Sequence, residues 1–327
     1  MITMAHGAGG RLSQRLVEEH FLPRLANAAL RELGDSAIVG ELALTTDSYT
    51  VDPRFFPGGD IGRLAICGTV NDLAMAGAEP IGLTAGFVLE EGLPLDELDR
   101  IVDSMAAASQ EAGVEVVAGD TKVVARGACD GIFINTAGVG RVESGFRPAA
   151  GRAEPGDTVL VSGPLGDHGM AVMARREGLP LRVELLSDVA PLIAPVRRLK
   201  EEGIEVHALR DPTRGGAAQS LTEIAGASGA RIVLDEASIP VRPEVRSACE
   251  LLGIDPLHVA NEGRLIAIVP AAAADAALRV LKADRLCKGA AAIGRVERGE
   301  PSLLMETELG ATRAIRLPLG ELLPRIC

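Results

Sequence analysis

The chain has 327 residues, and its 45 Asp and Glu outnumber 33 Lys and Arg, which gives a formal net charge of −12. This balance argues against a nucleic-acid groove, because such grooves need clustered Lys and Arg, and six Phe, one Tyr and no Trp offer few rings for base stacking. No apolar run reaches the roughly 20 residues of a spanning helix and no signal peptide is evident, so we expect a cytoplasmic protein that does not enter a membrane.

Strands and helices are predicted to alternate along the N-terminal half. Apolar spacing indicates a buried helix at 59–75, and the clearest helix is 94–113, with Pro at its start and Gly at its end. Strands are predicted at 37–46, 81–90, 114–124 and 129–142. An acidic segment that follows the first strand is expected to be a loop.

Residues 144–157 concentrate Gly, Pro and small side chains, which is typical of a linker. We therefore expect an N-terminal domain over 1–148 and a second domain over 149–317. The second half continues the alternation of helices and strands, so both domains are predicted to be α/β (α+β) in class. It ends in an expected hairpin, SLLMET and TRAIRLP joined by ELGA.

The last ten residues, 318–327, form a predicted mobile tail, because Pro318, Gly320 and Pro324 prevent a continuous helix. The tail carries the fifth cysteine of the chain, Cys327. An odd number of widely spaced cysteines indicates neither a disulfide framework nor a zinc site. The other four are expected to be buried as small hydrophobic side chains: Cys67, Cys129, Cys249 and Cys287.

Five aspartates stand beside Gly, Thr or Asn where strand ends or turns are expected: Asp47, Asp60, Asp72, Asp120 and Asp211. Mg²⁺ prefers oxygen ligands and bridges to substrate phosphates, so such carboxylates suit an acidic protein that binds a nucleotide. Asp beside Gly is also ordinary turn chemistry. From the residues alone, both interpretations stay open.

Two glycine-rich loops offer backbone N–H groups to phosphate oxygens. One spans 6–10 and contains Gly9 and Gly10; the other spans 213–216 and contains Thr213, Gly215 and Gly216. Either loop can equally be a tight turn that requires a positive φ. The P-loop, the dinucleotide fingerprint, the serine-hydrolase elbow and the metalloprotease motif are all missing from the sequence, so an ATP site would need another arrangement.

A resemblance is carried by seven segments, HGAGG, LTTDSYTVDP, GGDIGRLAICGTVNDLAMAGAEP, VVAGDTKVV, LRDPTRGG, VANEGRL and the terminal PRIC. Together they resemble the aminoimidazole ribonucleotide synthetase-like family of ATP-dependent enzymes, over nearly the whole chain. Selenophosphate synthetase and thiamine monophosphate kinase share the internal segments in weaker form. The terminal cysteine resembles one branch of the family, the carbamoyl dehydratases of hydrogenase maturation.

The resemblance implies a homodimer in which each N-terminal sheet contributes to a joint β-barrel, with ATP held between the sheets and the second domain. It places Asp47, Asp72 and Asp120 at Mg²⁺ and phosphate, with Asp211 approaching from the second domain. It also implies two partners. The carbamoyltransferase HypF would load a carbamoyl group on Cys327, and the HypC–HypD complex would receive cyanide for the iron of [NiFe]-hydrogenase.

The implied reaction is ATP-dependent dehydration of the carbamoylated Cys327 to a thiocyanate. It requires a base near the sulfur, and the resemblance brings Lys122 and Glu262 close to the docked tail. Glu262 would accept a proton, and Lys122 would hold phosphate or the carbamoyl oxygen. A solvated strand-end lysine and a glutamate cap are the plain structural alternatives for these two residues.

Two other functions remain alternatives. One is a synthetase or kinase of the same family that acts on a free small molecule, although such an enzyme has no need of a terminal cysteine. Selenophosphate synthetase in particular normally carries Cys or selenocysteine in the glycine-rich N-terminal segment, where this chain has neither. The other is a carrier that only presents a modified cysteine, against which the retained acidic positions and glycine loops argue.

Overall fold

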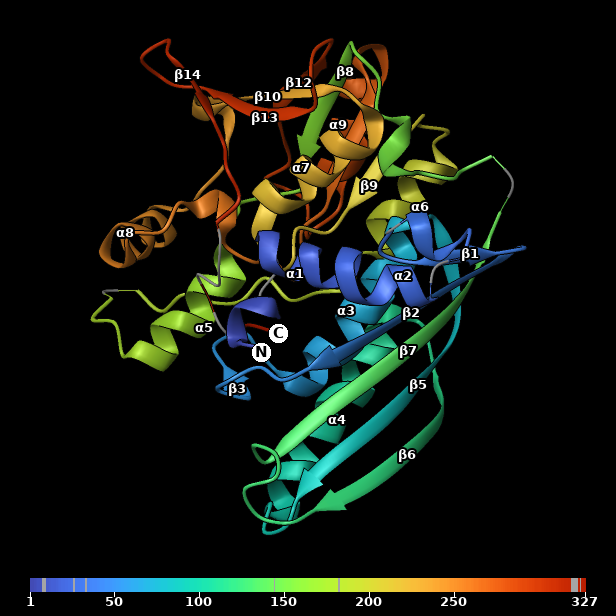
Figure 1. Ribbon diagram of the computed structural model, residues 1–327, viewed down its shortest axis with the longest axis vertical. Helices are drawn as coiled ribbons and strands as arrows, with labels where there is room; N and C mark the ends of the chain where they lie inside the picture. The colour runs from blue at the N-terminus through green and yellow to red at the C-terminus, as the bar shows by residue number, and fades with distance from the viewer. Residues whose placement is uncertain are drawn as a thin grey trace.

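A computed structural model describes residues 1–7, 10–25, 27–32, 34–143, 145–181, 183–318, 323 and 325–327. It contains two sheets, each with helices packed on it, and the two stand one above the other in Figure 1. The N-terminal sheet ends with Val142 and the C-terminal sheet begins with Asp157. No helix among the described residues combines the length and the apolar character needed to cross a membrane.

The N-terminal sheet has the strand order β1-β2-β7-β5-β6, and only β5 and β6 run parallel. Its strands are β1 (Ala37–Val39), β2 (Leu42–Tyr49), β5 (Ala78–Glu90), β6 (Val116–Val124) and β7 (Ile132–Val142). Helices α3 (Ile61–Met75) and α4 (Leu95–Ala112) lie along one face of it (Figure 1). A short pair, β3 (Phe55–Phe56) and β4 (Gly59–Asp60), precedes α3.

Helix α3 is buried on nearly all sides, which confirms the helix expected there and explains its run of apolar and small residues. Its first turn is capped by Asp60, whose Oδ1 accepts hydrogen bonds from the backbone N–H groups of Gly62 and Arg63 at 2.8 and 3.0 Å. Helix α4 ends at Gly113, whose φ of 70° gives the left-handed C-cap that the sequence indicates.

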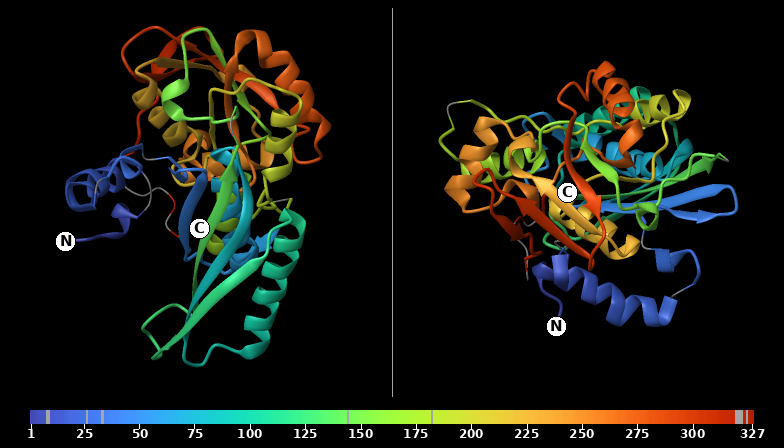
Figure 2. Two further views of the ribbon diagram at one scale, coloured as in Figure 1. Left: turned by 90° about the vertical axis from the view of Figure 1, so that its right-hand side faces the viewer. Right: turned by 90° about the horizontal axis from the view of Figure 1, so that it is seen from above.

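The predicted strand 37–46 is wrong in its extent. The backbone reverses at Gly40, where φ is 65°, so the segment forms the antiparallel hairpin β1–β2. Strand β2 then continues to Tyr49, which places Asp47 inside a strand rather than in the expected loop. The sequence analysis also gave no element for α1 (Gly10–Leu16), the π-helical turn η2 (Val17–Phe21) and α2 (Leu22–Leu25), which stand to one side of the sheet in Figure 2.

The C-terminal sheet has the order β14-β13-β10-β12-β8-β11-β9. Its strands are β8 (Asp157–Val161), β9 (Ala208–Arg210), β10 (Arg231–Asp235), β11 (Ile266–Pro270), β12 (Ala291–Glu297), β13 (Ser302–Glu306) and β14 (Thr312–Ala314). The main helices are α5 (Asp167–Glu177), α6 (Ile193–Glu201), α7 (Gly216–Ser228), α8 (Pro243–Leu252) and α9 (Ala274–Ala283). The expected hairpin is confirmed as β13–β14, with Leu304 opposite Ala314.

Three of the four cysteines expected in the interior, Cys67, Cys249 and Cys287, are buried. Cys129 is half-exposed, so its predicted burial is wrong. It lies in the connection between β6 and β7, where residues 125–128 and Asp130 are all exposed.

The end of the chain lies against the segment that follows β2. Thr50 N donates to Cys327 O at 3.1 Å, and Asp52 N donates to Arg325 O at 3.2 Å. Ile326 is buried between these contacts. The last three residues are therefore docked on their own chain, in the inward position that the sequence analysis expects for one state of a mobile tail.

The N-terminal sheet of a single chain is open. Its edges are β1 and β6, so the joint barrel implied by the family resemblance is not formed by one copy. Apolar side chains are exposed on this sheet, among them Val117 and Val123 of β6 and Leu44 of β2. Such exposure at a sheet edge is unusual for a surface in contact with water.

Candidate functional site

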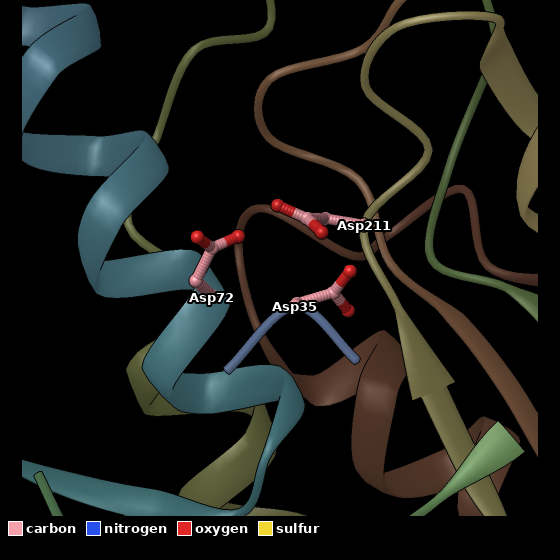
Figure 3. A group of neighbouring side chains, drawn as sticks. All are labelled: Asp35, Asp72 and Asp211. Atoms are coloured by element: carbon pink, nitrogen blue, oxygen red, sulfur yellow. The ribbon is translucent and has the colours of Figure 1, made fainter. Parts of the chain in front are cut away.

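Three aspartates from separate elements converge where the two domains meet. Asp35 precedes β1, Asp72 lies in the last turn of α3, and Asp211 follows β9 (Figure 3). One carboxylate oxygen from each lies within 4.8 Å of the others. Two of these carboxylates come from the N-terminal domain and one comes from the C-terminal domain.

Burial and like charge disfavour ionisation of this group. The pKa of Asp72 is raised well above its ordinary value by burial and then by Asp47, Asp211 and Asp35. Burial also raises the pKa of Asp211, and Asp35 and Asp47 add to the rise. Among the described residues, Asp211 Oδ2 is buried without a hydrogen-bond partner. A cluster of this kind, with oxygen ligands only, one aspartate buried and two half-buried, is suited to a hard divalent cation such as Mg²⁺.

Neighbouring side chains fix the orientation of the aspartates. Thr45 Oγ1 donates to Asp72 Oδ2 at 2.6 Å. The Arg210 guanidinium forms an ion pair with Asp35 and a second one with Glu223 at 3.1 Å. Burial raises the pKa of Asp35 to about 6, and Arg210 opposes that rise. One arginine therefore balances only part of the negative charge at this position.

Asp47 stands beside this cluster, as its contribution to the raised pKa values of Asp72 and Asp211 indicates. Its own pKa is raised by burial, and the charge of Arg214 opposes this shift. Tyr49 donates its hydroxyl to Asp47 Oδ2 at 3.3 Å. Of the four predicted metal ligands, Asp72 and Asp211 therefore belong to the cluster, and Asp47 is near enough to raise the pKa of both.

The fourth, Asp120, is not brought to the cluster in the same chain. Strand pairing runs in register through Asp47, Thr136, Ala85 and Gly119. Three strand spacings of about 4.8 Å separate the ends of that row by roughly 14 Å. Asp120 follows Gly119, so its side chain points to the opposite, open face of the sheet. There it pairs with Lys122 at 2.8 Å, with both side chains largely exposed.

The remaining predicted ATP ligands have clear local roles. Asp60 caps α3 and is outside the acidic cluster. At the start of α7, Gly215 and Gly216 have φ values of 79° and 63°, and a Cβ on Gly216 would approach Leu257 O to 2.5 Å. Gly216 N donates to Thr213 O, which closes the turn. The glycines are therefore required by the backbone, whether or not the loop also holds phosphate.

The N-terminal glycine loop is only partly described. Gly10 is buried with a φ of 77°, and a Cβ there would lie 3.2 Å from Pro318 O. The beginning of α1 therefore packs against the beginning of the tail. Gly9, the other predicted ligand in this loop, lies outside the described residues.

Glu262 is the most deeply buried of the proposed catalytic groups, with 2% of its surface exposed. Burial raises its pKa well above the ordinary value, and Asp211, Asp188 and Asp47 raise it further. Within the described part of the chain, Glu262 Oε1 has no hydrogen-bond partner. A carboxylate oxygen held in this way is available to a substrate rather than used as a cap.

Arg214 and Asp35 are the residues of this region that the sequence analysis did not single out. The pKa of Arg214 is raised first by its electrostatic interaction with Cys327, and Asp47 and Glu262 add to this effect. Arg214 also donates to Gly7 O at 3.2 Å. Asp35 follows Gly34 just before a strand, which is the same local signal that identified the other aspartates.

Comparisons with known proteins agree with this architecture. Two family models match consecutive segments: AIR synthase related protein, N-terminal domain, at residues 33–142, and AIR synthase related protein, C-terminal domain, at residues 154–305. Carbamoyl dehydratase HypE of Cupriavidus necator is 49% identical over 332 residues, which cover 100% of this chain and 95% of that protein.

Two solved structures extend the similarity to three dimensions. The crystal structure of a HypE–HypF complex matches with a TM-score of 0.90 at 48% identity, over 93% of this chain and 99% of that one. The hydrogenase maturation protein HypE in complex with ATP matches with a TM-score of 0.85 at 49% identity, over 99% of this chain and 100% of that one. The chain therefore belongs to the HypE family of hydrogenase maturation proteins, within the AIR synthase related proteins.

Proposed function

We propose that this chain is an ATP-dependent carbamoyl dehydratase that converts the S-carboxamide of its own Cys327 into an S-cyanate. The observation that carries this proposal is the docked chain end. Thr50 N holds Cys327 O at 3.1 Å, and Cys327 is the first of the charges that raise the pKa of Arg214, followed by Asp47 of the acidic group and Glu262. The name of the C. necator relative and the ATP complex of a second relative support the same reaction.

Two steps account for the chemistry with atoms balanced. The carbamoyl oxygen attacks the γ-phosphorus of ATP, ADP leaves, and one N–H proton is lost to give an O-phosphorylated imidate. The remaining N–H proton is then removed, the C–O bond breaks, and phosphate departs to leave S–C≡N. The oxygen of a carboxamide is a poor leaving group, and phosphorylation makes its departure feasible.

The acidic group fits Mg²⁺ because its donors are all carboxylate oxygens and one of them, on Asp211, is buried without a partner. Asp35, Asp47, Asp72 and Asp211 would hold the cation. Bound there, Mg²⁺ would neutralise charge on the transferred phosphoryl group. Arg214 supplies a further positive charge between the acidic group and the tail, where it would orient the phosphorylated oxygen.

Glu262 is the base in this proposal. A carboxylate accepts an N–H proton effectively when its pKa lies near the working pH, and burial shifts Glu262 in that direction. Its raised pKa also depends on the negative charges of Asp211 and Asp47. Neutralising those charges would lower the pKa of Glu262 and leave it ionised when ATP is in place.

We infer that a second copy of the chain completes the site. In one copy Lys122 and Asp120 point away from the acidic group, on the open face of the sheet, where Leu44 of β2 is also exposed. Covering this face with the same face of another chain would form the barrel implied by the family and bring the partner's Lys122 to the tail.

Mixing two inactive variants tests the shared site. Lys122→Ala and Glu262→Gln chains, each inactive alone, are expected to regain about one quarter of the wild-type sites when co-refolded, because half of the dimers are mixed and each has one intact site. ADP release after carbamoylation measures the recovery. If Lys122 acts in its own chain, mixed dimers hold no intact site and no activity returns.

Two partners follow from the proposed reaction. HypF, which forms a complex with a relative in a solved structure, would carbamoylate Cys327 after the tail leaves its docked position. The HypC–HypD complex would accept the cyano group on a nucleophile that attacks the thiocyanate carbon, and the S–C bond would break to release the Cys327 thiolate. Both interactions are proposals for this chain.

Mass spectrometry provides the direct test. We expect carbamoylated protein to lose one water from the peptide that ends at Cys327 when Mg·ATP is added, with one ADP formed per modified thiol. Protein with Cys327→Ser should bind ATP normally and show neither change. If intact carbamoylated protein binds Mg·ATP and keeps its mass, the chain is a carrier, and ADP formation with an added small molecule would instead support a synthetase or kinase.

A further inference from the structure

His168 contacts the docked chain end directly. It lies in the first turn of α5 and is fully buried, with its ring edge against the ring of Phe56 at 5.3 Å between centroids. Its Nε2 is 2.9 Å from Ile326 O, the carbonyl next to Cys327. Its Nδ1 is 2.8 Å from Ser187 Oγ.

The two partners determine which imidazole nitrogen carries the proton. A carbonyl oxygen can only accept, so Nε2 must donate to Ile326 O. Ser187 Oγ accepts a hydrogen bond from Val189 N at 3.1 Å, which leaves its own hydroxyl proton to donate to Nδ1. The neutral Nε2–H tautomer satisfies every partner, and burial lowers the pKa of His168, which favours the same neutral form.

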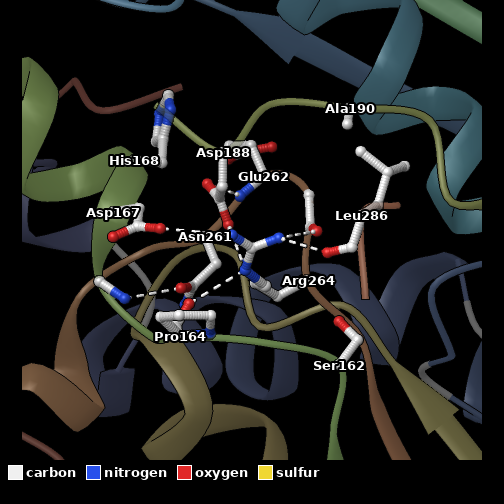
Figure 4. A network of polar contacts seen from close by, with 12 residues as sticks. Ser162, Pro164, Asp167, His168, Asp188, Ala190, Asn261, Glu262, Arg264 and Leu286 are labelled. Atoms are coloured by element: carbon white, nitrogen blue, oxygen red, sulfur yellow. Dashed lines mark hydrogen bonds and ion pairs between the residues drawn. The ribbon is translucent and has the colours of Figure 1, made fainter. Parts of the chain in front are cut away.

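The same short segment also supports the proposed base. Asp188, which follows Ser187, accepts a hydrogen bond from Glu262 N at 3.1 Å. Figure 4 shows Asp188 between His168 and Glu262. Asp188 is completely buried and forms an ion pair with Arg264 at 3.5 Å. Residues 187–188 therefore connect the contact with the tail to the backbone that carries Glu262.

We propose that His168 is a positioning residue that holds the chain end in the site, so that the carbamoyl group on Cys327 is aligned with Glu262. This inference rests on the proposed dehydratase activity for its purpose, and the docking it describes is independent of catalysis. Thr50, Asp52 and Arg176 hold the backbone of the last residues as well. His168 differs from them because its second nitrogen is linked to the segment that supports the base.

Two substitutions separate hydrogen bonding from packing. His168→Phe keeps the ring and its contact with Phe56 but removes the donor to Ile326 O. His168→Gln provides an amide N–H at a similar reach. We expect iodoacetamide to alkylate Cys327 about tenfold faster in the Phe variant, because one hydrogen bond to a buried acceptor is lost, and at nearly the wild-type rate in the Gln variant.

The rate of dehydration should fall in the variant in which the rate of alkylation rises. In the full-length dimer carbamoylated by HypF, we expect His168→Phe to slow dehydration by about tenfold, with carbamoylation unimpaired because the tail is released more often. Val245→Ala is the matched control. Val245 is buried and lies against Gly166 before α5, so its replacement should lower Tm, and because it keeps the hydrogen bond from His168 to Ile326 O it should leave the alkylation rate unchanged.

Each outcome decides the inference. Wild-type alkylation and dehydration rates in a folded His168→Phe protein would overturn it, as would equal acceleration of alkylation in Val245→Ala. If His168→Phe does not fold, Ser187→Ala keeps the ring and removes the donor to Nδ1 together with the acceptor of Val189 N, and an unchanged alkylation rate there would overturn the inference instead. Failure of every variant, wild type included, to dehydrate would reject the proposed function, while the alkylation result would still decide the docking role.

Discussion

Replacement of Glu262 by Gln is expected to slow dehydration of carbamoylated Cys327 by about a hundredfold or more, which is the usual contribution of a positioned general base. The amide keeps the shape of the side chain but cannot accept the N–H proton. ATP binding should persist, because Glu262 is not one of the three clustered aspartates. A single-turnover assay on pre-carbamoylated protein, followed by mass spectrometry, measures the effect.

Glu223→Gln is a suitable control for this experiment. Glu223 pairs with Nη2 of Arg210 while Asp35 pairs with Nη1, so the substitution removes one negative charge near the site and leaves the Arg210–Asp35 pair in place. Its dehydration rate should stay within about threefold of the wild type. A Glu262→Gln enzyme that retained its rate would require another base and would leave the buried, partnerless Oε1 without a catalytic role.

Replacement of Asp72 by Asn is expected to weaken Mg²⁺-dependent ATP binding by about a hundredfold, because it removes a central carboxylate of the acidic group. The same change should raise the Tm of the cation-free protein. The raised pKa of Asp72 means that its ionised form is disfavoured by burial and by Asp47, Asp211 and Asp35, and a neutral amide escapes that cost. Thermal melting with and without Mg²⁺, together with calorimetry of ATP binding, checks both effects.

Asp60→Ala provides the contrast. The structure uses Asp60 as the N-cap of α3, so its loss should cost about 1 kcal/mol of stability while the response to Mg²⁺ remains. The two substitutions should therefore shift the Tm of the cation-free protein in opposite directions. A parallel loss of ATP binding in both variants would show that Asp60 also contacts the nucleotide, as the sequence analysis expected.

Local sequence patterns predicted the helices and strands that bury one face and that end at a recognisable residue such as a C-cap glycine. Helix α4 has apolar residues at helical spacing and stops at Gly113, and the structure follows both signals. The N-terminal helical segment had no such pattern to find, because most of its side chains are exposed on all sides and include Phe21 and Leu25. Residues 37–46 form a hairpin because β1 and β2 pair with each other. Pairing and register depend on which strands meet, and this cannot be seen in a single segment.

In the candidate site as well, short sequence segments identified some of the residues, and the fold decided which of them lie together. Asp47, Asp72 and Asp211 were chosen from short segments, and the fold places them together. Asp35 has the same local signal, a preceding glycine and a following strand, but the sequence did not single it out, and the three-dimensional convergence identifies it. Asp120 shows the converse, because its segment looks equivalent while the strand pairing places it on the other face of the sheet. Which aspartates share a cation is therefore decided by topology.

The acidic group spans the division between the two domains, and this has a thermodynamic consequence. Without a cation, Asp35 and Asp72 of one domain repel Asp211 of the other, while Arg210 of the second domain pairs with Asp35 of the first. A bound divalent ion would reverse the sign of that interaction and join the domains. We expect calorimetry to resolve two overlapping melting transitions in chelator and a single cooperative transition in Mg·ATP, so that ligand occupancy sets the size of the cooperative folding unit.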